Sequence, residues 1–178
     1  MAECRHILIT GDVGIGKSTL IRTLLRKLNR PVYGFETVKI DHPEKDGWRY
    51  YMFPAMTPAQ NRYLSDENLI GIRRKQIIGR PEVFDTLGVQ LIRAAKPDGI
   101  LLMDELGFLE SEAEAFQTAV LEALHGTIPV IAAVKKKDGV PFLNAVCACP
   151  QTVLYTVTPE NRMLLADEIM QSELIFRE

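Results

Sequence analysis

One segment near the start of the chain limits the possible folds more than any other. It reads Gly11-Asp12-Val13-Gly14-Ile15-Gly16-Lys17-Ser18-Thr19 and fits the pattern G-x-x-x-x-G-K-[ST]. Residues 6–10 before it form a short apolar run that predicts a buried strand. After it, apolar residues repeat on one helical face: Leu20, Ile21, Leu24, Leu25 and Leu28. A phosphate-binding loop requires a strand, a glycine-rich loop and a helix in this order, which disfavours a glycine-rich turn that binds no ligand.

The residue types in this loop suit the chemistry of a phosphate group. Gly11, Gly14 and Gly16 lack a Cβ atom, so the backbone can adopt positive φ and approach a ligand closely. The loop then directs a row of N–H groups at an anion, and the following helix adds the positive end of its dipole. We expect Lys17 to reach the β- and γ-phosphates and the Ser18 hydroxyl to ligate Mg²⁺. The residues expected to bind the nucleotide here are Gly11, Asp12, Val13, Gly14, Ile15, Gly16, Lys17, Ser18 and Thr19.

Size and charge narrow the class of protein further. The 178 residues are expected to form a single domain, 1–178, with helices on both faces of a central sheet. The net charge of −2 gives no overall field that would attract nucleic acid or an anionic membrane, although local basic patches leave nucleic acid open. No apolar run approaches the roughly 20 residues that span a bilayer, and the first strand begins too early to leave room for a signal peptide. We therefore expect a cytoplasmic protein without a membrane partner.

The cysteines and histidines do not predict a metal centre. Cys147 and Cys149 are separated by one residue and Cys4 is distant in sequence, so no zinc-binding spacing is present. The histidines are scattered along the chain: His6, His42 and His125. We expect ordinary thiols, and structural or surface histidines.

Strand and helix signals alternate along the rest of the chain. Strands are expected at residues 32–40, 48–53, 100–103, 128–134 and 153–157, and the first two of these predict an antiparallel hairpin. Helices are expected at residues 82–95, 111–124, 140–145 and 158–171. The last of these would open with Thr158 as N-cap and Pro159 at the first helical position. Residues 54–66 are expected to form a loop with at most a short helical turn, and the apolar tail 174–176 is expected to dock on the body.

The sequence of residues 69–78 is compatible with two different structures. Two apolar stretches flank the basic run Arg73-Arg74-Lys75, so the segment is either one bent strand or a mobile loop. Three adjacent cations form a solvated surface in most proteins. The alternative is that one of them is directed at the phosphates, as an arginine finger is.

The alternation of strands and helices predicts an α/β fold built on a mostly parallel sheet. In such a sheet the ligand lies beyond the carboxyl ends of the strands, where both the glycine loop and Asp104-Glu105 are expected. Four apolar residues followed by Asp104 resemble a Walker B strand, so Asp104 is expected to hold Mg²⁺ opposite Ser18. Glu105 is expected to orient a water molecule for attack and to accept its proton. The alternative for this acidic pair is a solvent-facing turn at the end of a strand.

Asp104-Glu105-Leu106-Gly107 also matches the D-x-x-G element of GTPases. Such a protein requires an N-K-x-D element to recognise guanine, and the sequence contains none. A signalling GTPase is therefore excluded.

Taken in order, these motifs resemble the small P-loop nucleoside-triphosphatases of the thermophile phosphohydrolase and human cancer-related type. The elements that carry the resemblance are residues 11–19, Gly34-Phe35-Glu36-Thr37, Gly47-Trp48-Arg49, the stretch 104–110, and Thr158-x-x-Asn161-Arg162. The resemblance implies a P-loop NTPase three-layer sandwich with an antiparallel hairpin added to its sheet. It also implies that Asn161 and Arg162 lie near the nucleotide, whereas a helix terminus exposed to water is the alternative.

Some positions depart from the pattern of that family. Val13 stands where Pro is frequent, Lys39 takes an Arg position, and Met163 follows Asn161-Arg162 where an acid is common. Phe108 replaces the Lys of the stretch D-E-I-G-K-M-E. The residues expected to bind phosphate and Mg²⁺ are retained.

Three functions fit the residues. The leading hypothesis is a Mg²⁺-dependent nucleoside-triphosphatase that hydrolyses ATP- or GTP-type nucleotides to the diphosphate and phosphate, with Lys17 and Glu105 as catalytic residues. The first alternative is a kinase that transfers the γ-phosphate to a nucleoside, nucleic-acid or small-molecule hydroxyl. The second is a nucleotide-gated binding module with little turnover.

Overall fold

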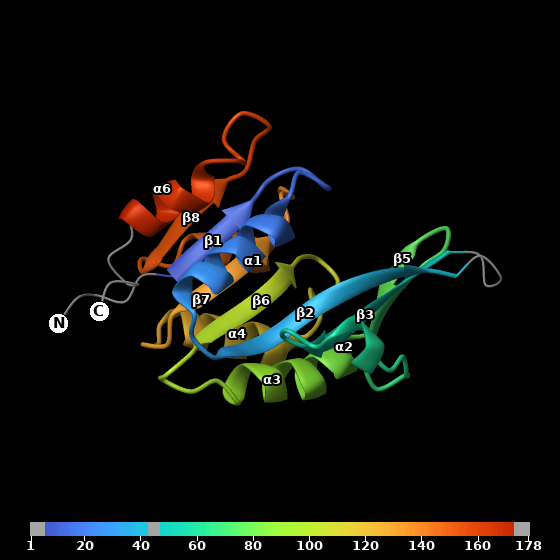
Figure 1. Ribbon diagram of the computed structural model, residues 1–178. Coiled ribbons are helices and arrows are strands. Elements are labelled where there is room, and N and C mark those ends of the chain that lie inside the picture. Colours follow the sequence, from blue (N-terminus) through green and yellow to red (C-terminus); the bar gives the residue numbers. More distant parts are fainter. Residues whose placement is uncertain (1–5, 43–46, 173–178) are drawn as a thin grey trace.

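The computed structural model describes residues 6–42 and 47–172, which form one eight-stranded sheet with helices on both of its faces (Figure 1). The strands are β1 (His6–Thr10), β2 (Val32–Asp41), β3 (Trp48–Pro54), β4 (Leu69–Arg73), β5 (Ile77–Gly79), β6 (Ile100–Leu106), β7 (Val130–Val134) and β8 (Thr152–Thr156). The helices are α1 (Lys17–Leu28), α2 (Pro81–Val83), α3 (Val89–Arg93), α4 (Glu114–Leu124), α5 (Pro141–Cys147) and α6 (Leu165–Ser172). A π-helical turn, Phe84–Gly88, joins α2 to α3, and Ala59–Asn61 form a short 3₁₀ turn.

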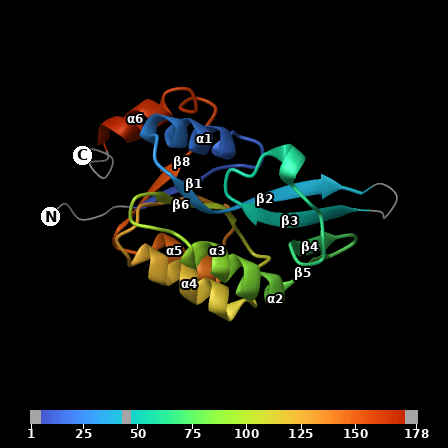
Figure 2. The same cartoon turned by 60° about the horizontal axis from the view of Figure 1, so that its bottom comes forward.

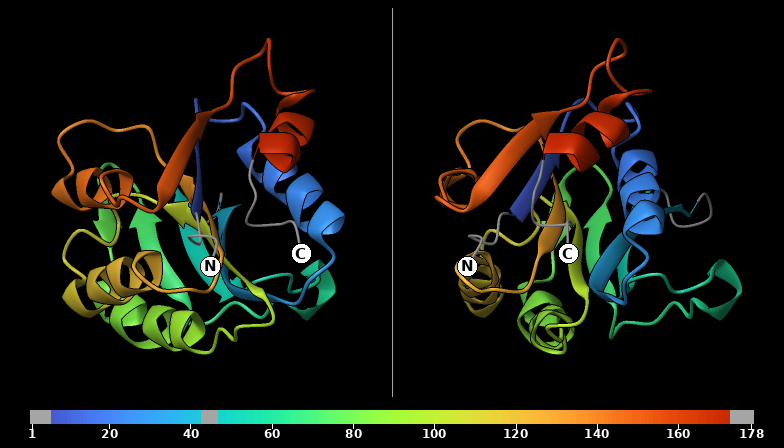
Figure 3. Two further views of the ribbon diagram at one scale, coloured as in Figure 1. Left: turned by 90° about the vertical axis from the view of Figure 1, so that its left-hand side faces the viewer. Right: turned by 60° about the vertical axis from the view of Figure 1, so that its left-hand side comes forward.

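The sheet combines a parallel part and an antiparallel part in the order β5-β4-β3-β2-β6-β7-β1-β8. Strands β2, β6, β7, β1 and β8 pair in parallel, whereas β2, β3, β4 and β5 pair antiparallel in succession. Helices α1 and α6 cover one face, and α2 to α5 cover the other (Figures 2 and 3). This arrangement confirms the mostly parallel α/β sheet with an antiparallel hairpin addition.

The apolar strands are buried on both faces because helices pack on both. In β1, Ile7 and Ile9 belong to the cluster under α1 and α6, whereas Leu8 belongs to the cluster under α3, α4 and α5. In β6, Leu102 belongs to the cluster under α1 and α6, and Met103 belongs to the cluster under α3, α4 and α5. A strand that alternates between two apolar cores must be continuously apolar, which is the pattern that predicted these strands.

Residues 69–78, for which the sequence allowed either one bent strand or a mobile loop, form neither. They belong to the hairpin β4–β5, in which Arg73 is the last residue of β4 and Arg74, Lys75 and Gln76 make the turn. Within this turn, Arg74 N–H donates to the Gln76 carbonyl over 3.0 Å. Gly71 and Gly79 face each other across this hairpin, and a Cβ atom on Gly79 would lie 2.3 Å from the Leu109 carbonyl oxygen. The hairpin therefore depends on two glycines that admit the 107–110 loop, and no turn residue such as Gly, Asn or Pro marks its bend.

The last helix begins later than predicted. Helix α6 starts at Leu165, because Asn161 holds the preceding residues in turns: its Oδ1 accepts from Thr158 N–H over 2.8 Å, and its Nδ2 donates to the Thr156 carbonyl over 2.9 Å. Such side-chain bonds offer the backbone an alternative to a helix. The predicted helix 111–124 likewise begins at Glu114, and the short helical turn in 54–66 is confirmed.

Some predictions concern residues outside the described part of the chain, namely Cys4 and the tail 174–176. Within residues 6–42 and 47–172, no cluster of His, Cys, Asp and Glu is arranged as a metal site, and no helix is long and apolar enough to cross a membrane. Cys147 is exposed and Cys149 is buried, and both are free thiols.

The core under α3 and α4 is organised by Phe116, which is fully buried and lies 5.0 Å from Phe84 and 5.7 Å from Phe35, ring centre to ring centre. Replacing it with Ala leaves a cavity among rings that cannot collapse onto it. We expect Phe116→Ala to lower the free energy of unfolding by about 3–5 kcal/mol in urea titrations. Tyr63→Ala, at a side chain that is 83% exposed, is the control and should change it by less than about 0.5 kcal/mol. Equal effects of the two substitutions would contradict this description of the core.

Candidate active site

The glycine loop lies at the carboxyl end of β1 and has the conformation that its sequence predicts. Gly11, Gly14 and Gly16 adopt φ values of 147°, 76° and 115°. Gly11 also lies against the segment after β8, since a Cβ atom there would be 2.8 Å from the Val157 carbonyl oxygen. Helix α1 follows the loop directly, with Gly16 as its N-cap residue, so its positive end faces the loop.

Lys17 is held across this loop rather than extended into solvent. Its ammonium donates to the carbonyl oxygens of Gly11 at 3.0 Å and Asp12 at 3.2 Å, and the residue is only 9% exposed. The same nitrogen lies 3.6 Å from Glu105 Oε2, at the end of β6. The loop after β1 and the acidic pair of β6, distant in sequence, therefore meet as predicted.

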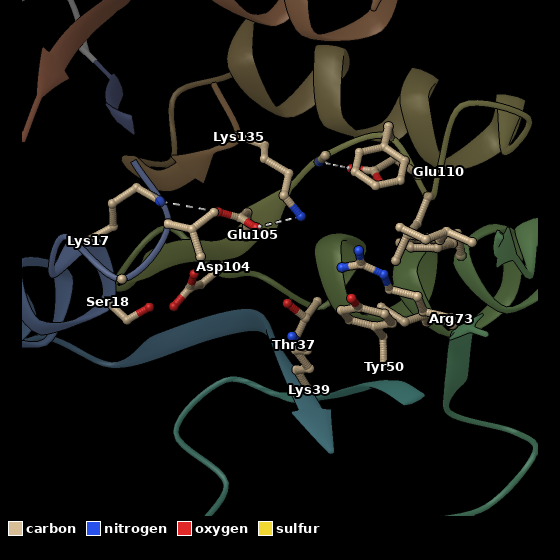
Figure 4. Close-up of a pocket in the computed structure, with 18 of the residues that line it drawn as sticks. Lys17, Ser18, Thr37, Lys39, Tyr50, Arg73, Asp104, Glu105, Glu110 and Lys135 are labelled. Carbon is tan, nitrogen blue, oxygen red and sulfur yellow. Dashed lines mark hydrogen bonds and ion pairs between the residues drawn. The ribbon is translucent and has the colours of Figure 1, made fainter. Parts of the chain in front are cut away.

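Asp104 directs its side chain toward Ser18 (Figure 4). Burial raises the pKa of this carboxyl to about 6, the Ser18 hydroxyl bonded to it opposes the rise, and the nearby Glu105 and Glu36 carboxylates add to it. A buried carboxylate and a hydroxyl are hard oxygen donors, the kind that Mg²⁺ prefers. A divalent cation would also remove the electrostatic penalty that raises the Asp104 pKa, so the donor set fits Mg²⁺.

Glu105 lies between two lysines. One of its oxygens is 3.6 Å from Lys17 Nζ, and the other is 3.5 Å from Lys135 Nζ, at the end of β7 (Figure 4). The Phe108 ring supports Lys135 and Lys137, whose ammonium groups lie 5.0 Å and 3.9 Å from its centre. Two cations thus fix the orientation of the one carboxylate that is a candidate general base.

Lys135 is a site residue that the sequence reasoning missed. The run Lys135-Lys136-Lys137 follows an apolar strand and carries no signal that separates its three members. Only the neighbouring strand shows the difference: Lys135 N–H donates to the Leu106 carbonyl, which aligns Lys135 with the end of β6, whereas Lys136 pairs with Asp12 at 3.5 Å.

Glu110 fixes the loop that follows the acidic pair. Its side chain is 2% exposed and accepts a hydrogen bond from the Gly107 N–H. Burial is the main cause that raises its pKa to about 7; hydrogen bonds from the backbone and the charge of Lys135 lower it in part. This carboxyl therefore changes its charge near neutral pH while it holds the backbone next to Glu105.

These residues line one cleft of about 580 Å³ above the carboxyl ends of the strands (Figure 4). The predicted residues that line it are Val13, Gly14, Gly16, Lys17, Ser18, Thr19, Asp104 and Glu105. Lining residues that were not predicted include Thr37, Lys39, Tyr50, Glu110 and Lys135. Of the basic run 73–75, Arg73 at the end of β4 lines the cleft, whereas Arg74 and Lys75 in the turn are exposed outside it.

The other predicted binding residues lie beside the cleft rather than in its wall. Gly11, Asp12 and Ile15 belong to the glycine loop but do not line the cleft. Asn161 and Arg162 lie in the turns between β8 and α6, next to the strand that carries the loop. Their contact with a nucleotide stays a prediction.

The sheet, the glycine loop and the acidic pair together define a P-loop nucleotide-binding protein of the α/β class. The profile of the family described as NTPase matches residues 6–170. The chain therefore belongs to the NTPase family, a family of nucleoside-triphosphatases, and its recognition from the sequence motifs is confirmed.

Individual relatives agree with this assignment. The chain is 32% identical to "Nucleoside-triphosphatase THEP1" of Methanocaldococcus jannaschii, with 95% of this chain and 97% of the relative covered. It is 29% identical to "Cancer-related nucleoside-triphosphatase homolog" of Bos taurus, with 93% and 95% covered. The crystal structure of THEP1 from Aquifex aeolicus superposes with a TM-score of 0.69 at 23% identity, covering 93% of this chain and 97% of that chain, which shows the common fold.

The raised pKa of Glu110 predicts a pH-dependent stability. A carboxyl with a folded-state pKa near 7, above its usual 4.5, favours folding while protonated, and this contribution is lost as the pH rises through 7. Glu110→Gln keeps an acceptor for Gly107 N–H but does not become charged. We therefore expect its free energy of unfolding, measured with urea, to increase relative to that of the unmodified protein by up to about 3 kcal/mol between pH 5 and pH 8. The exposed Glu112→Gln is the control and should show no such difference. An identical pH dependence in all three proteins would refute the assignment to Glu110.

Proposed function

We propose that this protein is a Mg²⁺-dependent nucleoside-triphosphatase that hydrolyses ATP- or GTP-type nucleotides to the diphosphate and phosphate. The single observation that supports this most is the position of Glu105. It lies 3.6 Å from the loop lysine, where the γ-phosphate of a nucleotide in the loop would end, and two lysines hold its carboxylate in place. A carboxylate at this point can orient a water molecule in line with the terminal phosphate.

The loop residues bind and orient the substrate in this proposal. The N–H groups of 11–19 and the α1 N-terminus hold the β- and γ-phosphates, and Lys17 exchanges its two carbonyl contacts for phosphate oxygens as negative charge grows on them. Ser18 and Asp104 are the residues that would hold Mg²⁺, which when bound neutralises charge on the phosphate oxygens.

Glu105 acts on the attacking water. Its carboxylate accepts the proton of the water as the oxygen of that water bonds to the γ-phosphorus and the bond to the β-phosphate oxygen breaks. Lys135, on the far oxygen of the same carboxylate, keeps Glu105 in the orientation that the transfer needs. Phosphoryl transfer is mostly positioning and electrostatics, so a fixed carboxylate and a fixed ammonium are the main contributions of the chain.

The two substitutions that test this mechanism most directly have different expected effects. Lys17→Ala removes the cation that the loop holds, and we expect it to abolish phosphate release. Glu105→Gln keeps the shape of the side chain but removes the base, so nucleotide should stay bound while the rate falls by about 10²-fold or more. Glu122→Gln, exposed on α4, is the matched control and should leave the rate unchanged. An unchanged rate in Glu105→Gln would remove Glu105 from the mechanism.

The same assay separates hydrolysis from the two other functions that fit the sequence. Release of phosphate from nucleotide with water alone supports the hydrolase. Loss of the γ-phosphate only when an alcohol acceptor is added supports a kinase, and tight binding without turnover supports a binding module.

A further inference from the structure

The antiparallel strands place four polar side chains on one face of the sheet. Lys39 on β2 pairs with Tyr50 on β3, and Trp48, two residues before Tyr50, pairs with Arg73 on β4. Side chains alternate along a strand, so Thr37 lies on the same face as Lys39, and Arg73 lies on the same face as Tyr50. Thr37, Lys39, Tyr50 and Arg73 all line the cleft, toward the end away from Lys17 and Ser18 (Figure 4). We name these four residues the distal rim.

The two cations of the distal rim have no acidic partner in the part of the chain that the structure describes. Within residues 6–42 and 47–172, neither Lys39 nor Arg73 forms an ion pair. The Lys39 ammonium lies 3.8 Å from the centre of the Trp48 ring, a contact that leaves its charge uncompensated. The distal rim is therefore a positive, hydroxyl-bearing edge.

The acidic residues that line the cleft do not neutralise this edge, because each of them is engaged by another group. Glu105 is paired with two lysines, Glu110 accepts from a backbone N–H, and Asp104 is bonded to Ser18. An anion that enters the distal end therefore meets positive charge first.

The floor below the distal rim is apolar. It is formed by Ile70, Ile77, Phe84 and Leu109, which line the same cleft. Gly71 pairs with Tyr50, and a Cβ atom there would come within 3.1 Å of the Leu109 side chain, so the missing side chain leaves Leu109 at the floor. An apolar floor with a few polar groups at its edge is the usual composition of a site for a small organic ligand.

The nucleotide does not account for this half of the cleft. In the proposed mode of binding, the γ-phosphate is the terminal group of the nucleotide and ends next to Glu105, so no nucleotide atom is assigned to the distal rim. A water molecule that attacks this phosphate needs neither two cations nor an apolar floor. The proposed hydrolysis therefore leaves the cations and the apolar floor of the distal end without a ligand.

We propose that the distal end binds a second ligand, a small phosphate monoester with an apolar body. Its phosphate lies between Lys39 and Arg73 and accepts hydrogen bonds from Thr37 and Tyr50, and its apolar body lies on Phe84 and Leu109. The guanidinium of Arg73 suits this group because it donates two parallel hydrogen bonds to one phosphate. The inference rests on the proposed function only in that a nucleotide fills the other end.

Calorimetry in two stages tests the inference. The full chain is first titrated with Mg²⁺ and AMP-PNP, a non-hydrolysable ATP analogue, and this stage reports on the proposed function alone. The saturated complex is then titrated separately with phenyl phosphate and with inorganic phosphate. Since only phenyl phosphate covers the apolar floor, we expect it to bind at 1:1 and at least about tenfold more tightly than inorganic phosphate.

Substitutions in the distal rim locate the binding. Lys39→Gln and Arg73→Gln should each weaken phenyl phosphate by about tenfold or more, because each removes a charged donor. Arg74→Gln is the matched control, since Arg74 directly follows Arg73 but lies outside the cleft, and this variant should bind as the unmodified protein does. Unchanged AMP-PNP binding in all three variants shows that they are folded.

Three results would overturn the inference. They are the absence of saturable phenyl phosphate binding to the loaded protein, equal affinity for both probes, and binding that Lys39→Gln and Arg73→Gln leave unchanged. Failure of AMP-PNP itself to bind in the first stage would instead refute the proposed function.

Discussion

The contact between the Lys17 ammonium and the Glu105 carboxylate, 3.6 Å apart, is the interaction on which the other features of the cleft depend. It exists because β1 and β6 are parallel strands of one sheet, separated only by β7, so their carboxyl ends meet at the same edge. The loop after β1 supplies the cation and the end of β6 supplies the acid. The proposed hydrolysis needs both groups at one place, and the order of the strands brings them together.

Three carboxyl groups close to each other show how the environment assigns different roles to the same chemical group. Asp104 and Glu110 are buried, and burial raises the pKa of each, to about 6 and about 7. Glu105 lies between two lysines instead and keeps a quarter of its side chain exposed to water. The first of the three is suited to receive a cation, the second to hold a backbone loop, and the third to act on a water molecule.

The sequence predicted the parts of the structure that depend on local chemistry. The glycine loop, the doubly buried strands and the acidic pair each carry a pattern that a few adjacent residues determine, and the edge of a parallel sheet then fixes their relative positions. The β4–β5 hairpin was not predicted, because its turn is made of Arg74, Lys75 and Gln76 and its pairing depends on a distant loop around Leu109. The predicted start of α6 was wrong because the Asn161 side chain forms hydrogen bonds with the backbone of residues 156 and 158 and holds this segment in turns. Lys135 was missed because only the pairing of β6 with β7 distinguishes it from the two lysines that follow.

The central claim is that the glycine loop and the acidic pair act on a single metal–triphosphate. A crystal structure of the protein with Mg²⁺ and a non-hydrolysable nucleoside triphosphate tests it most directly. The account predicts the β- and γ-phosphates in the loop, the metal between Ser18 and Asp104, and a water molecule between the γ-phosphate and Glu105. A triphosphate bound away from the loop, or bound in the loop with Glu105 turned away from its terminal phosphate, would contradict it.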